Sequence, residues 1–498
     1  MNLGNRRVVV TGIGAVTPLG ASYNRNGRNE FWENMVAEKS AISVIEGLPG
    51  IANYHRILGA EIKNWNLEDY FSKEEIGGEK SYERILSLDK AIQFALAATK
   101  LALKDARLLN ASNGNYNSKG IGNNFGFYTG NGMQCIQSIE AQSADFAQKY
   151  ALELGKEFLR QIRNFKSLLL EGTAQKKKEC TGCIVLLEKI VDEELRNLSE
   201  SKNIHEFKVV EPYHIFKEMP ATIFNYLNYA ICGYVAQLFG LHGPTLAVNS
   251  ACSSGNDAII EGFKAILCDD VDVVIAGGTE APIASPIVSM FNRLGVMSKT
   301  GVKPGDKKRD GFALGEGAGY LILEELEHAK SRVARIYSEL VSYGQSNDAY
   351  HMLSLHPSGQ YVMDAVRKAL IKAEIKPEDV DYINPHTTST KQCDEIESKI
   401  IRDVFGSNLE NILIHPSKCM TGHFQAGAGA VEAVLINLIF QNNYIPGIPE
   451  AEDPDPECVK YVPQGGVKRK INTALSMSLG FGGHNSITIF RRYQLSGN

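Results

Sequence analysis

Cys252 is the residue whose surroundings most clearly suggest chemistry. It follows the apolar run TLAVNS, lies in the small-residue turn ACSSG and precedes the helical run NDAIIEGFKAIL. A strand, a tight turn and a helix in this order expose a nucleophile, and the helix N-terminus favours a lowered thiol pKa, toward the thiolate that attacks carbonyl groups. For a lone cysteine, a buried structural thiol at a sheet edge is the alternative.

Two histidines stand in comparable positions later in the chain. The sequence holds only 11 histidines, and His386 in NPHTTST and His423 in KCMTGHFQAGAGA both lie in polar turns after predicted strands. Such turns are where α/β folds build their sites. Considered singly, each histidine fits a capping or hydrogen-bonding role as well as a catalytic one.

Two further features belong to the same part of the sequence. Lys418 precedes His423 by five residues and could hold a carboxylate such as Glu432, although a solvated surface lysine is the simpler interpretation. The loop GFGGHN at 480–485 offers flexible backbone whose N–H groups could bind an oxyanion. A thiol, two imidazoles and backbone donors together would suit transfer of an acyl group.

The predicted strands and helices that position these residues indicate an α/β protein. Short Val- and Ile-rich runs bounded by glycine alternate with helical patterns, which predicts strands covered on both faces. A similar set of runs follows residue 335, so the second half looks like a loose echo of the first. We therefore predict two halves, residues 1–335 and 336–498, in a duplicated core.

Residues 148–211 differ in composition from the rest of the chain. They hold 12 Lys and Arg and 11 Asp and Glu, a charged fraction well above the 22% of the whole sequence. Apolar residues at helical spacing predict two amphipathic helices packed as a hairpin inserted into the core. The Cys180 and Cys183 pair within it supplies only half of a zinc ligand set, so we predict no metal site.

Taken together, these motifs resemble the β-ketoacyl synthase family, in particular the elongating synthases that extend acyl chains on acyl carrier protein. The resemblance covers nearly the whole chain outside 148–211. It is carried by motifs that are individually weak and jointly specific: RRVVVTGIGAVTPLG, NSACSSG, GGTEAPI, RDGFALGEGAG, NPHTTST leading to Asp394 and Glu397, SKCMTGH and LGFGGHN. It implies the thiolase-like fold, a duplicated αβαβα layered arrangement, here with a helical insertion.

The resemblance also implies roles for individual residues. Cys252 would carry the acyl chain, His386 and His423 would serve the condensation, and Lys418 with Glu432 would support the site. The backbone N–H groups of Cys252 and Phe481 would form the oxyanion hole. The remaining implied roles are gating of the acyl pocket by Phe481, lining of that pocket by Met133, support from Thr388 and Thr390, and carrier docking by Arg293 and Lys299.

The implied reaction is a decarboxylative Claisen condensation. An acyl-enzyme thioester would react with malonyl-acyl carrier protein to give a 3-oxoacyl product, without a cofactor. Thr387 stands where the family usually has glycine, and His484 stands where it usually has threonine. These departures and the insertion give polyketide or other secondary-metabolite synthesis a weight comparable to fatty-acid synthesis.

Three other functions share parts of this pattern. A Cys-His hydrolase needs the same nucleophile and base, but the second histidine argues against it. A dinucleotide-binding protein is disfavoured because GIGAVT lacks the third glycine and the acidic residue about 20 positions later. A non-condensing partner subunit of a ketosynthase heterodimer is the strongest alternative, although such partners typically lack the nucleophilic cysteine.

Composition bounds the remaining expectations. The 498 residues carry a net charge of −5, with no single-sign block, which argues against a large nucleic-acid footprint. Nine scattered cysteines fit a reducing compartment, so we expect a cytoplasmic protein. The apolar run after Arg7 suits a buried first strand better than a secretion signal, and no run reaches the roughly 18 apolar residues of a membrane span. The family's usual dimer predicts a homodimer, with a heterodimer of related subunits as an option.

Overall fold

The computed structural model describes residues 6–23, 27–46, 48, 56–109, 124–132 and 227–494. The chain divides into two compact units, one made of Met1–Gln137 with Asn225–Asn498 and the other of Ser138–Phe224. The second unit lies outside the described residues, and so do the predicted hairpin at 148–211 and Met133. All described residues belong to the first unit.

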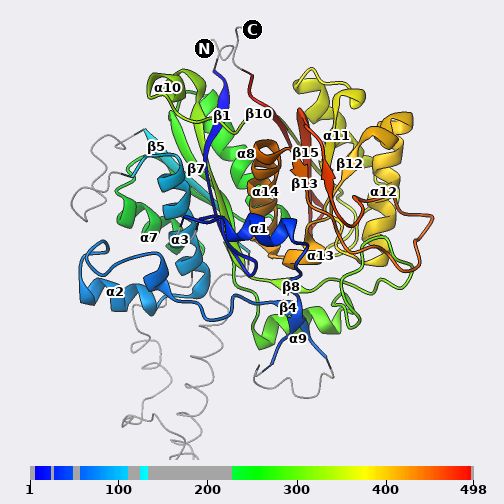
Figure 1. Cartoon of the computed structure of the whole chain (residues 1–498), viewed down its shortest axis with the longest axis horizontal. Helices are drawn as coiled ribbons and strands as arrows, with labels where there is room; N and C mark the ends of the chain where they lie inside the picture. The colour runs from blue at the N-terminus through cyan, green and yellow to red at the C-terminus, as the bar shows by residue number, and fades with distance from the viewer. Residues whose placement is uncertain are drawn as a thin grey trace, which may run out of the picture. The chain divides into compact units, whose positions relative to one another are not determined.

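An 11-stranded sheet organises this unit (Figure 1). Its strands before residue 335 are β1 (Val8–Thr17), the short β2 (Gly20–Ala21), β5 (Phe125–Gly130), β6 (Thr245–Val248), β7 (Val273–Glu280) and β9 (Gly317–Glu325). Its strands after residue 335 are β10 (Ser338–Asn347), β11 (Tyr382–Asn384), β12 (Leu413–Ile414), β15 (Thr473–Gly480) and β16 (His484–Arg491).

The two sets of strands have the same topology. From its outer edge inward, the first set runs β6-β5-β7-β9-β1 and the second runs β12-β11-β15-β16-β10. In both, the outer three strands are parallel and the inner pairings are antiparallel. The antiparallel pairing of β1 with β10 joins the sets. This repetition supports our proposal that the two halves meet between β9 and β10; the boundary at residue 335 stays a prediction.

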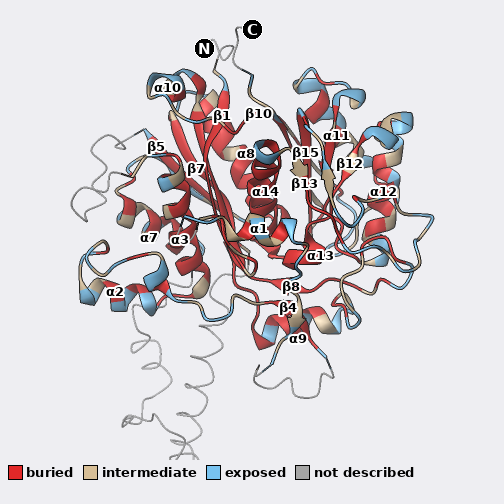
Figure 2. Ribbon diagram, in the orientation of Figure 1, coloured by how far each residue is buried: buried red, intermediate tan, exposed pale blue. Residues whose placement is uncertain are grey.

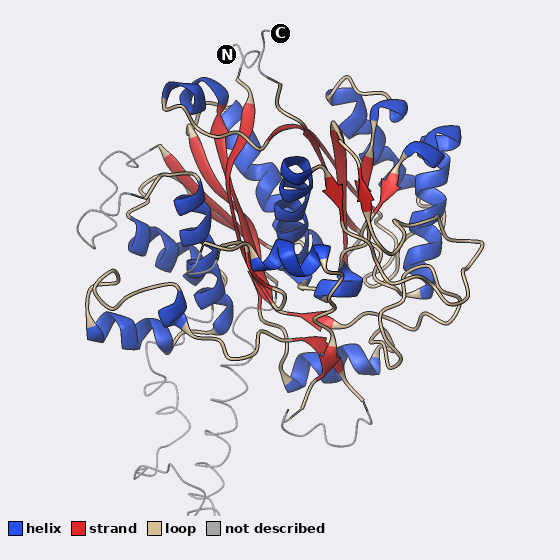
Figure 3. Cartoon of the chain, viewed as in Figure 1, coloured by secondary structure: helices blue, strands red, loops and turns tan. Residues whose placement is uncertain are grey.

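Helices fill the space between and outside the two sets of strands (Figure 3). Helices α8 (Ser254–Leu267) and α14 (Ala428–Asn442) pack against each other and against strands of both sets. Helices α3 (Lys90–Asp105) and α7 (Ala230–Phe239) cover the outer face of the first set, and α11 (Gln360–Lys372) and α12 (Lys391–Phe405) cover the second. The predicted five-layer αβαβα arrangement is therefore confirmed.

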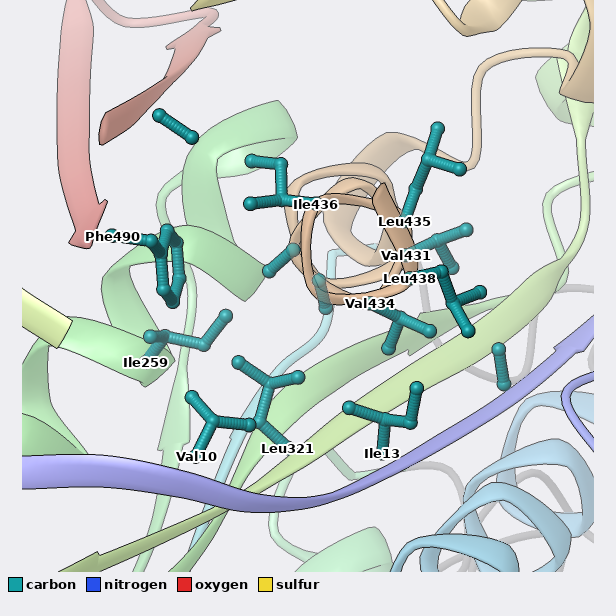
Figure 4. Close-up of a cluster of buried hydrophobic side chains, with 14 of the residues drawn as sticks. Val10, Ile13, Ile259, Leu321, Val431, Val434, Leu435, Ile436, Leu438 and Phe490 are labelled. Carbon is teal, nitrogen blue, oxygen red and sulfur yellow. The ribbon is translucent and has the colours of Figure 1, made fainter. Parts of the chain in front are cut away.

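The central layer is the most deeply buried part of this unit (Figure 2). Every residue of α14 from Ala428 to Phe440 is buried, as expected for a predominantly apolar helix surrounded by sheets. Its side chains meet those of β1, α8, β9 and β16 in one cluster, which Figure 4 shows around Val434, Ile13, Leu321 and Phe490. The cluster fixes the two central helices, whose N-terminal ends carry the candidate site.

Glycines allow the outer helices to approach the strands closely. A Cβ on Gly14 of β1 would lie 2.0 Å from the carbonyl oxygen of Ala98 on α3. A Cβ on Gly344 of β10 would lie 1.9 Å from the carbonyl oxygen of Ala365 on α11. The first strand of each half thus packs backbone to backbone against its own covering helix.

The remaining elements are short and lie around this core. They are α1 (Glu30–Val36), α2 (Glu79–Leu86), α9 (Ser285–Arg293), α10 (Leu326–Ser331), α13 (Lys418–Thr421), the strands β3 (Ser43–Val44), β4 (Leu58–Ala60) and β8 (Leu314–Gly315) of one small sheet, the pair β13 (Tyr444–Ile445) and β14 (Val467–Lys468), and several short 3-10 helices. Within the described ranges, no helix combines the length and the apolar character needed to cross a membrane.

Candidate active site

Most of the predicted site residues line one cavity of about 490 Å³. It opens where the turns preceding α8 and α14 meet the loop after β11 and the loop after β15. The predicted residues on its wall are Cys252, His386, His423, Thr388, Thr390 and Phe481. Segments separated by more than 200 positions in the chain are therefore brought to one place by the duplicated core.

Cys252 occupies the predicted strand-turn-helix elbow. Strand β6 ends at Val248, a 3-10 turn covers Ala251–Ser253, and α8 begins at Ser254. Ala251 has φ of +54°, a left-handed conformation that is strained for a residue with a Cβ. The hydroxyl of Ser254 braces the turn by accepting from the Ser250 N–H at 2.8 Å and donating to the Ala251 carbonyl at 2.6 Å.

The electrostatics of the thiol differ from the sequence-based expectation. Burial raises the pKa of Cys252 to about 12, rather than the helix N-terminus lowering it. The Lys418 ammonium and the backbone N–H groups of Phe481 and Cys252 act in the opposite direction but do not outweigh desolvation. The resting sulfur is therefore a protonated thiol, and it donates to Oε1 of Gln425 at 3.3 Å.

The same interactions indicate where an oxyanion would be held. The N–H groups of Phe481 and Cys252 both stabilise negative charge on Sγ, so both face the reacting position. Phe481 itself stacks obliquely on Phe291, with ring centroids 6.2 Å apart, at the edge of an apolar cluster. Its backbone thus serves the polar end of the cavity while its ring belongs to the apolar side.

His386 and His423 lie edge to face, with ring centroids 5.4 Å apart and an interplanar angle of 81°. Both are buried, and burial, aided by the positive charge of Lys418, holds the pKa of each imidazole well below its usual range. For His386 the neighbouring His423 adds to this effect. The rings are therefore neutral near pH 7. Among the described residues, Nδ1 of His423 has no hydrogen-bond partner.

The loop that carries His386 is held by Glu397 of α12. One carboxylate oxygen of Glu397 accepts from the backbone N–H of His386 at 2.6 Å, and the other accepts from the N–H and the hydroxyl of Thr387 at 2.7 and 2.6 Å. The hydroxyl of Thr387 thus helps to fasten the loop. The hydroxyls of Thr388 and Thr390 lie 3.1 Å apart on the same loop.

Lys418 and Glu432 form a buried ion pair behind the histidines. Lys418 opens α13 and Glu432 lies on α14, their Nζ and Oε1 atoms are 2.5 Å apart, and their side chains are 2% and 4% exposed. The predicted pairing is confirmed, and the solvated-lysine alternative is wrong. Neither residue lines the cavity. Lys418 acts on the site through its charge.

Four other positions singled out in the sequence lie away from the cavity wall or beyond the described residues. Arg293 and Lys299 are exposed, and they flank the segment Leu294–Val296, which does line the cavity. His484 begins β16 and borders a separate small pocket with Asp257 and Gln345. Met133 lies outside the residues that the structure describes.

Gln425 is a functional candidate that sequence reasoning missed. It lines the cavity, follows His423 by two positions and accepts a hydrogen bond from the Cys252 thiol. The available signal was a long polar side chain inside the otherwise small and apolar run FQAGAGA, immediately before a buried helix. Over the described part of the chain, no group of three or more His, Cys, Asp and Glu side chains is arranged to hold a metal ion.

The chain matches two descriptions of protein families. The β-ketoacyl synthase N-terminal domain matches residues 5–149 and 127–329, and the β-ketoacyl synthase C-terminal domain matches residues 337–452. Among curated proteins, 3-oxoacyl-[acyl-carrier-protein] synthase 2 of Staphylococcus aureus (strain COL) is 30% identical over 98% of this chain and 99% of its own length. The protein of the same name from Synechocystis sp. is also 30% identical, over 99% of this chain and 100% of its own length.

Solved structures give the same result. A ketosynthase of a type II polyketide synthase, AntDE:AntF, in complex with its acyl-carrier protein and bound to the hexaketide, superposes with a TM-score of 0.71 at 28% identity, covering 99% of this chain and 100% of that one. The ishigamide ketosynthase/chain length factor superposes with a TM-score of 0.73 at 24% identity, covering 99% and 100%, and so shows a shared fold.

Proposed function

The chain belongs to the β-ketoacyl synthase family, and from that premise we propose that it condenses an acyl thioester with malonyl-acyl carrier protein, losing carbon dioxide to give a 3-oxoacyl-acyl carrier protein. The observation that carries the proposal is one cavity lined by the Cys252 thiol, two neutral imidazoles and the Phe481 loop. These groups match the needs of a reaction that first stores an acyl group and then stabilises an enolate.

The first half-reaction transfers the acyl group. The sulfur of Cys252 attacks the carbonyl carbon of the carrier thioester, the oxygen becomes negative in the hole formed by the N–H groups of Cys252 and Phe481, and the bond to the carrier sulfur breaks. The thiol proton ends on the departing carrier thiolate. Because burial keeps Cys252 protonated, a base must take that proton on the way, and the neutral imidazoles of the same cavity are available to do so.

The second half-reaction forms the carbon–carbon bond. The bond between the malonyl carboxylate and its α-carbon breaks, releasing carbon dioxide and leaving an enolate on the carrier thioester. Imidazole N–H groups of His386 and His423 donate to the enolate oxygen. The α-carbon attacks the acyl-Cys252 carbonyl, the bond from that carbon to Sγ breaks, and the departing thiolate takes up one proton from the solvent.

Lys418 supports this reaction from outside the cavity lining, through its charge. Its positive charge, balanced by Glu432, disfavours protonation of both imidazoles. A neutral imidazole has one N–H to donate and one lone pair to accept, whereas a protonated ring has no lone pair left. The ion pair therefore keeps the histidines in the form that both half-reactions use.

Acyl carrier protein is the proposed partner, and fatty-acid and polyketide synthesis both remain open as the pathway. The 3-oxoacyl-[acyl-carrier-protein] synthase 2 relatives support the first, and the AntDE:AntF ketosynthase with its bound hexaketide supports the second. A non-condensing role as a chain length factor is the alternative, because such factors occur in similar complexes. The intact Cys252 at a strained elbow argues against it.

A dimer is proposed from the edge of the sheet. Strand β6 is the last strand on its side, and its residues Thr245–Val248 are exposed or half-buried, with Leu246 42% exposed. An apolar edge strand is a site of strand pairing, and a second copy or a related subunit could continue the sheet there. We propose the homodimer and a cytoplasmic location, the latter because all six cysteines of the described ranges are free. The two-helix hairpin expected for residues 148–211 stays a prediction.

Incubation with a panel of acyl carrier thioesters tests the proposal. Intact-protein and peptide mass spectrometry should find one acyl group on Cys252, and addition of malonyl carrier thioester should discharge it as a 3-oxoacyl product. A chain length factor would take up no acyl group. The preferred chain in the panel would also reveal the pathway that the enzyme serves.

A further inference from the structure

Gln425 places a buried amide against the nucleophile, and one end of that amide has no partner. The side chain is 3% exposed, and its Oε1 accepts from Cys252 Sγ at 3.3 Å. Its Nε2 is buried without a hydrogen-bond partner in the described part of the chain. A buried amide nitrogen left unpaired costs about 1–3 kcal/mol, so a partner that arrives with the substrate would recover that energy.

The backbone that carries this amide is held firmly in place. Gln425 has φ of +47°, a strained value for a residue with a Cβ, in the 3-10 turn Gln425–Gly427 that leads into α14. The next carbonyl, that of Ala426, lies so close to Gly255 of α8 and Gly278 of β7 that a Cβ on either would approach it to 2.6 or 2.9 Å. Packing between the central helices and β7 thus fixes the backbone from which the amide extends toward the sulfur.

Four other polar groups around the sulfur have substrate atoms to bind in the proposed reaction. The N–H groups of Cys252 and Phe481 favour negative charge at Sγ, and in the proposed reaction they hold the acyl carbonyl oxygen. The two neutral imidazoles suit the enolate oxygen of the malonyl group. When Cys252 is acylated its S–H is lost, so Oε1 of Gln425 also loses its donor and the amide is released to face the bound chain. An oxygen further along that chain is the acceptor that remains for Nε2.

We propose that the Gln425 amide selects acyl chains that carry a keto oxygen on their third carbon, so that the enzyme extends unreduced 3-oxoacyl groups in preference to saturated ones. This inference rests on the proposed condensing function and names its substrate class. In the acylated protein the third carbon would lie three bonds from Sγ, and Oε1 of Gln425 lies 3.3 Å from that sulfur. A keto oxygen only accepts hydrogen bonds, and an amide NH₂ only donates, so the two are complementary.

A saturated chain would leave the amide buried and unpaired. The site would then discriminate through the energy of the unsatisfied donor, the effect by which polar sites reject substrates that lack their partner group. The 3-oxoacyl thioester is also the product of the proposed condensation. Preference for it would make the enzyme suited to repeated extension without a reducing step between rounds.

The test compares loading of two pantetheine thioesters, 3-oxohexanoyl and hexanoyl. They differ only at the third carbon, which is a carbonyl group in the first and a CH₂ group in the second. Rates of adduct formation on Cys252 are measured by intact-protein mass spectrometry for the natural protein, for Gln425→Met and Gln425→Leu, and for the control Gln360→Leu. Gln360 is an exposed glutamine at the start of α11, outside the cavity. Pantetheine esters remove any contribution from carrier docking.

The natural protein and Gln360→Leu should load the 3-oxo ester faster than the saturated one. In either Gln425 variant the ratio of the 3-oxohexanoyl rate to the hexanoyl rate should fall by about tenfold. An unchanged preference, or an equal loss with both esters, would overturn the inference while leaving the condensing function in place. Absence of an adduct from both esters in the natural protein would instead contradict the proposed function, and the inference with it.

Discussion

The imidazole rings of His386 and His423 meet edge to face with their centroids 5.4 Å apart, although the two residues come from separate loops of the second half. Burial and the nearby Lys418 charge hold the pKa of both rings well below the usual value, so both are neutral through the range in which cells operate. Two neutral donors side by side are arranged to share a developing negative oxygen.

Carbon dioxide release from malonyl carrier thioester should depend on this pair. In a Cys252→Gln protein, whose amide can mimic the acylated cysteine, malonyl substrate should be decarboxylated without condensation. Adding His386→Ala or His423→Ala should lower that release by about 100-fold or more, because loss of one oxyanion donor typically costs that much. Release of labelled carbon dioxide is the measurement.

Exposed His242 provides the matched control, since His242→Ala removes an imidazole far from the cavity lining. That variant should decarboxylate at the rate of its Cys252→Gln parent. Efficient release by the triple variant lacking both His386 and His423 would move the enolate-stabilising role to backbone donors or to Lys418.

The layered fold and the convergence of Cys252, His386 and His423 on one cavity could be foreseen from the sequence. Alternating strand and helix patterns predicted the layers, and the turns ACSSG and NPHTTST marked strand ends where sites form. The motifs and their order along the chain then indicated the family that the chain resembles, and with it the roles of the three residues. The Lys418–Glu432 pair was also foreseen, as one option for Lys418 and as a role that the family resemblance implies.

The state of the thiol and the role of Gln425 could not be foreseen. The helix N-terminus behind Cys252 suggested a lowered thiol pKa, but the degree of burial depends on residues distant in sequence, and desolvation proved the larger effect. Gln425 bears on the site through a contact across 173 positions, between turns that only the duplicated core brings together. Sequence spacing does not encode such a contact.

Breaking the buried ion pair should destabilise the protein strongly. Lys418→Met leaves the Glu432 carboxylate buried without its cation, which should lower the free energy of unfolding by about 3 kcal/mol or more. Burial already raises the pKa of Glu432, so the loss should be greater at pH 8 than at pH 6, where the carboxyl neutralises more readily. Urea unfolding at both values measures this.

The double variant Lys418→Met with Glu432→Leu should recover much of that stability, because no buried charge remains. It should still load acyl groups poorly at low pH, since the charge that disfavours imidazole protonation is gone and a protonated ring has no lone pair to take the thiol proton. Equal stability of the single and double variants would show that the pair does not act as a coupled unit.

Alkylation of the nucleophile should report its protonation. With a thiol pKa of about 12, the rate of Cys252 modification by iodoacetamide should keep rising with pH through pH 9, by about tenfold per unit. Peptide mapping separates this site from exposed Cys268, which serves as the internal labelling control. A rate that levels off below pH 8 would mean that the thiolate already dominates near neutral pH.

Charge reversal at the cavity rim should impair use of the carrier. Arg293→Glu or Lys299→Glu should raise KM for acyl carrier thioesters several-fold but leave pantetheine esters unaffected, because steering by surface charge acts on the acidic carrier and not on the small ester. Raising the salt concentration should reduce the difference between variant and natural protein. Equal effects on both classes of substrate would rule out these residues as a docking site.

Turnover with acyl and malonyl carrier thioesters together tests the assignment most directly. The natural protein should release carbon dioxide and form a 3-oxoacyl product longer than the starting acyl chain by two carbons, with an acyl adduct on Cys252 visible before malonyl substrate is added. Cys252→Ala should keep its fold by circular dichroism yet form neither adduct nor product. Product formation at the natural rate by Cys252→Ala would contradict the assignment of this residue as the nucleophile of a condensing enzyme.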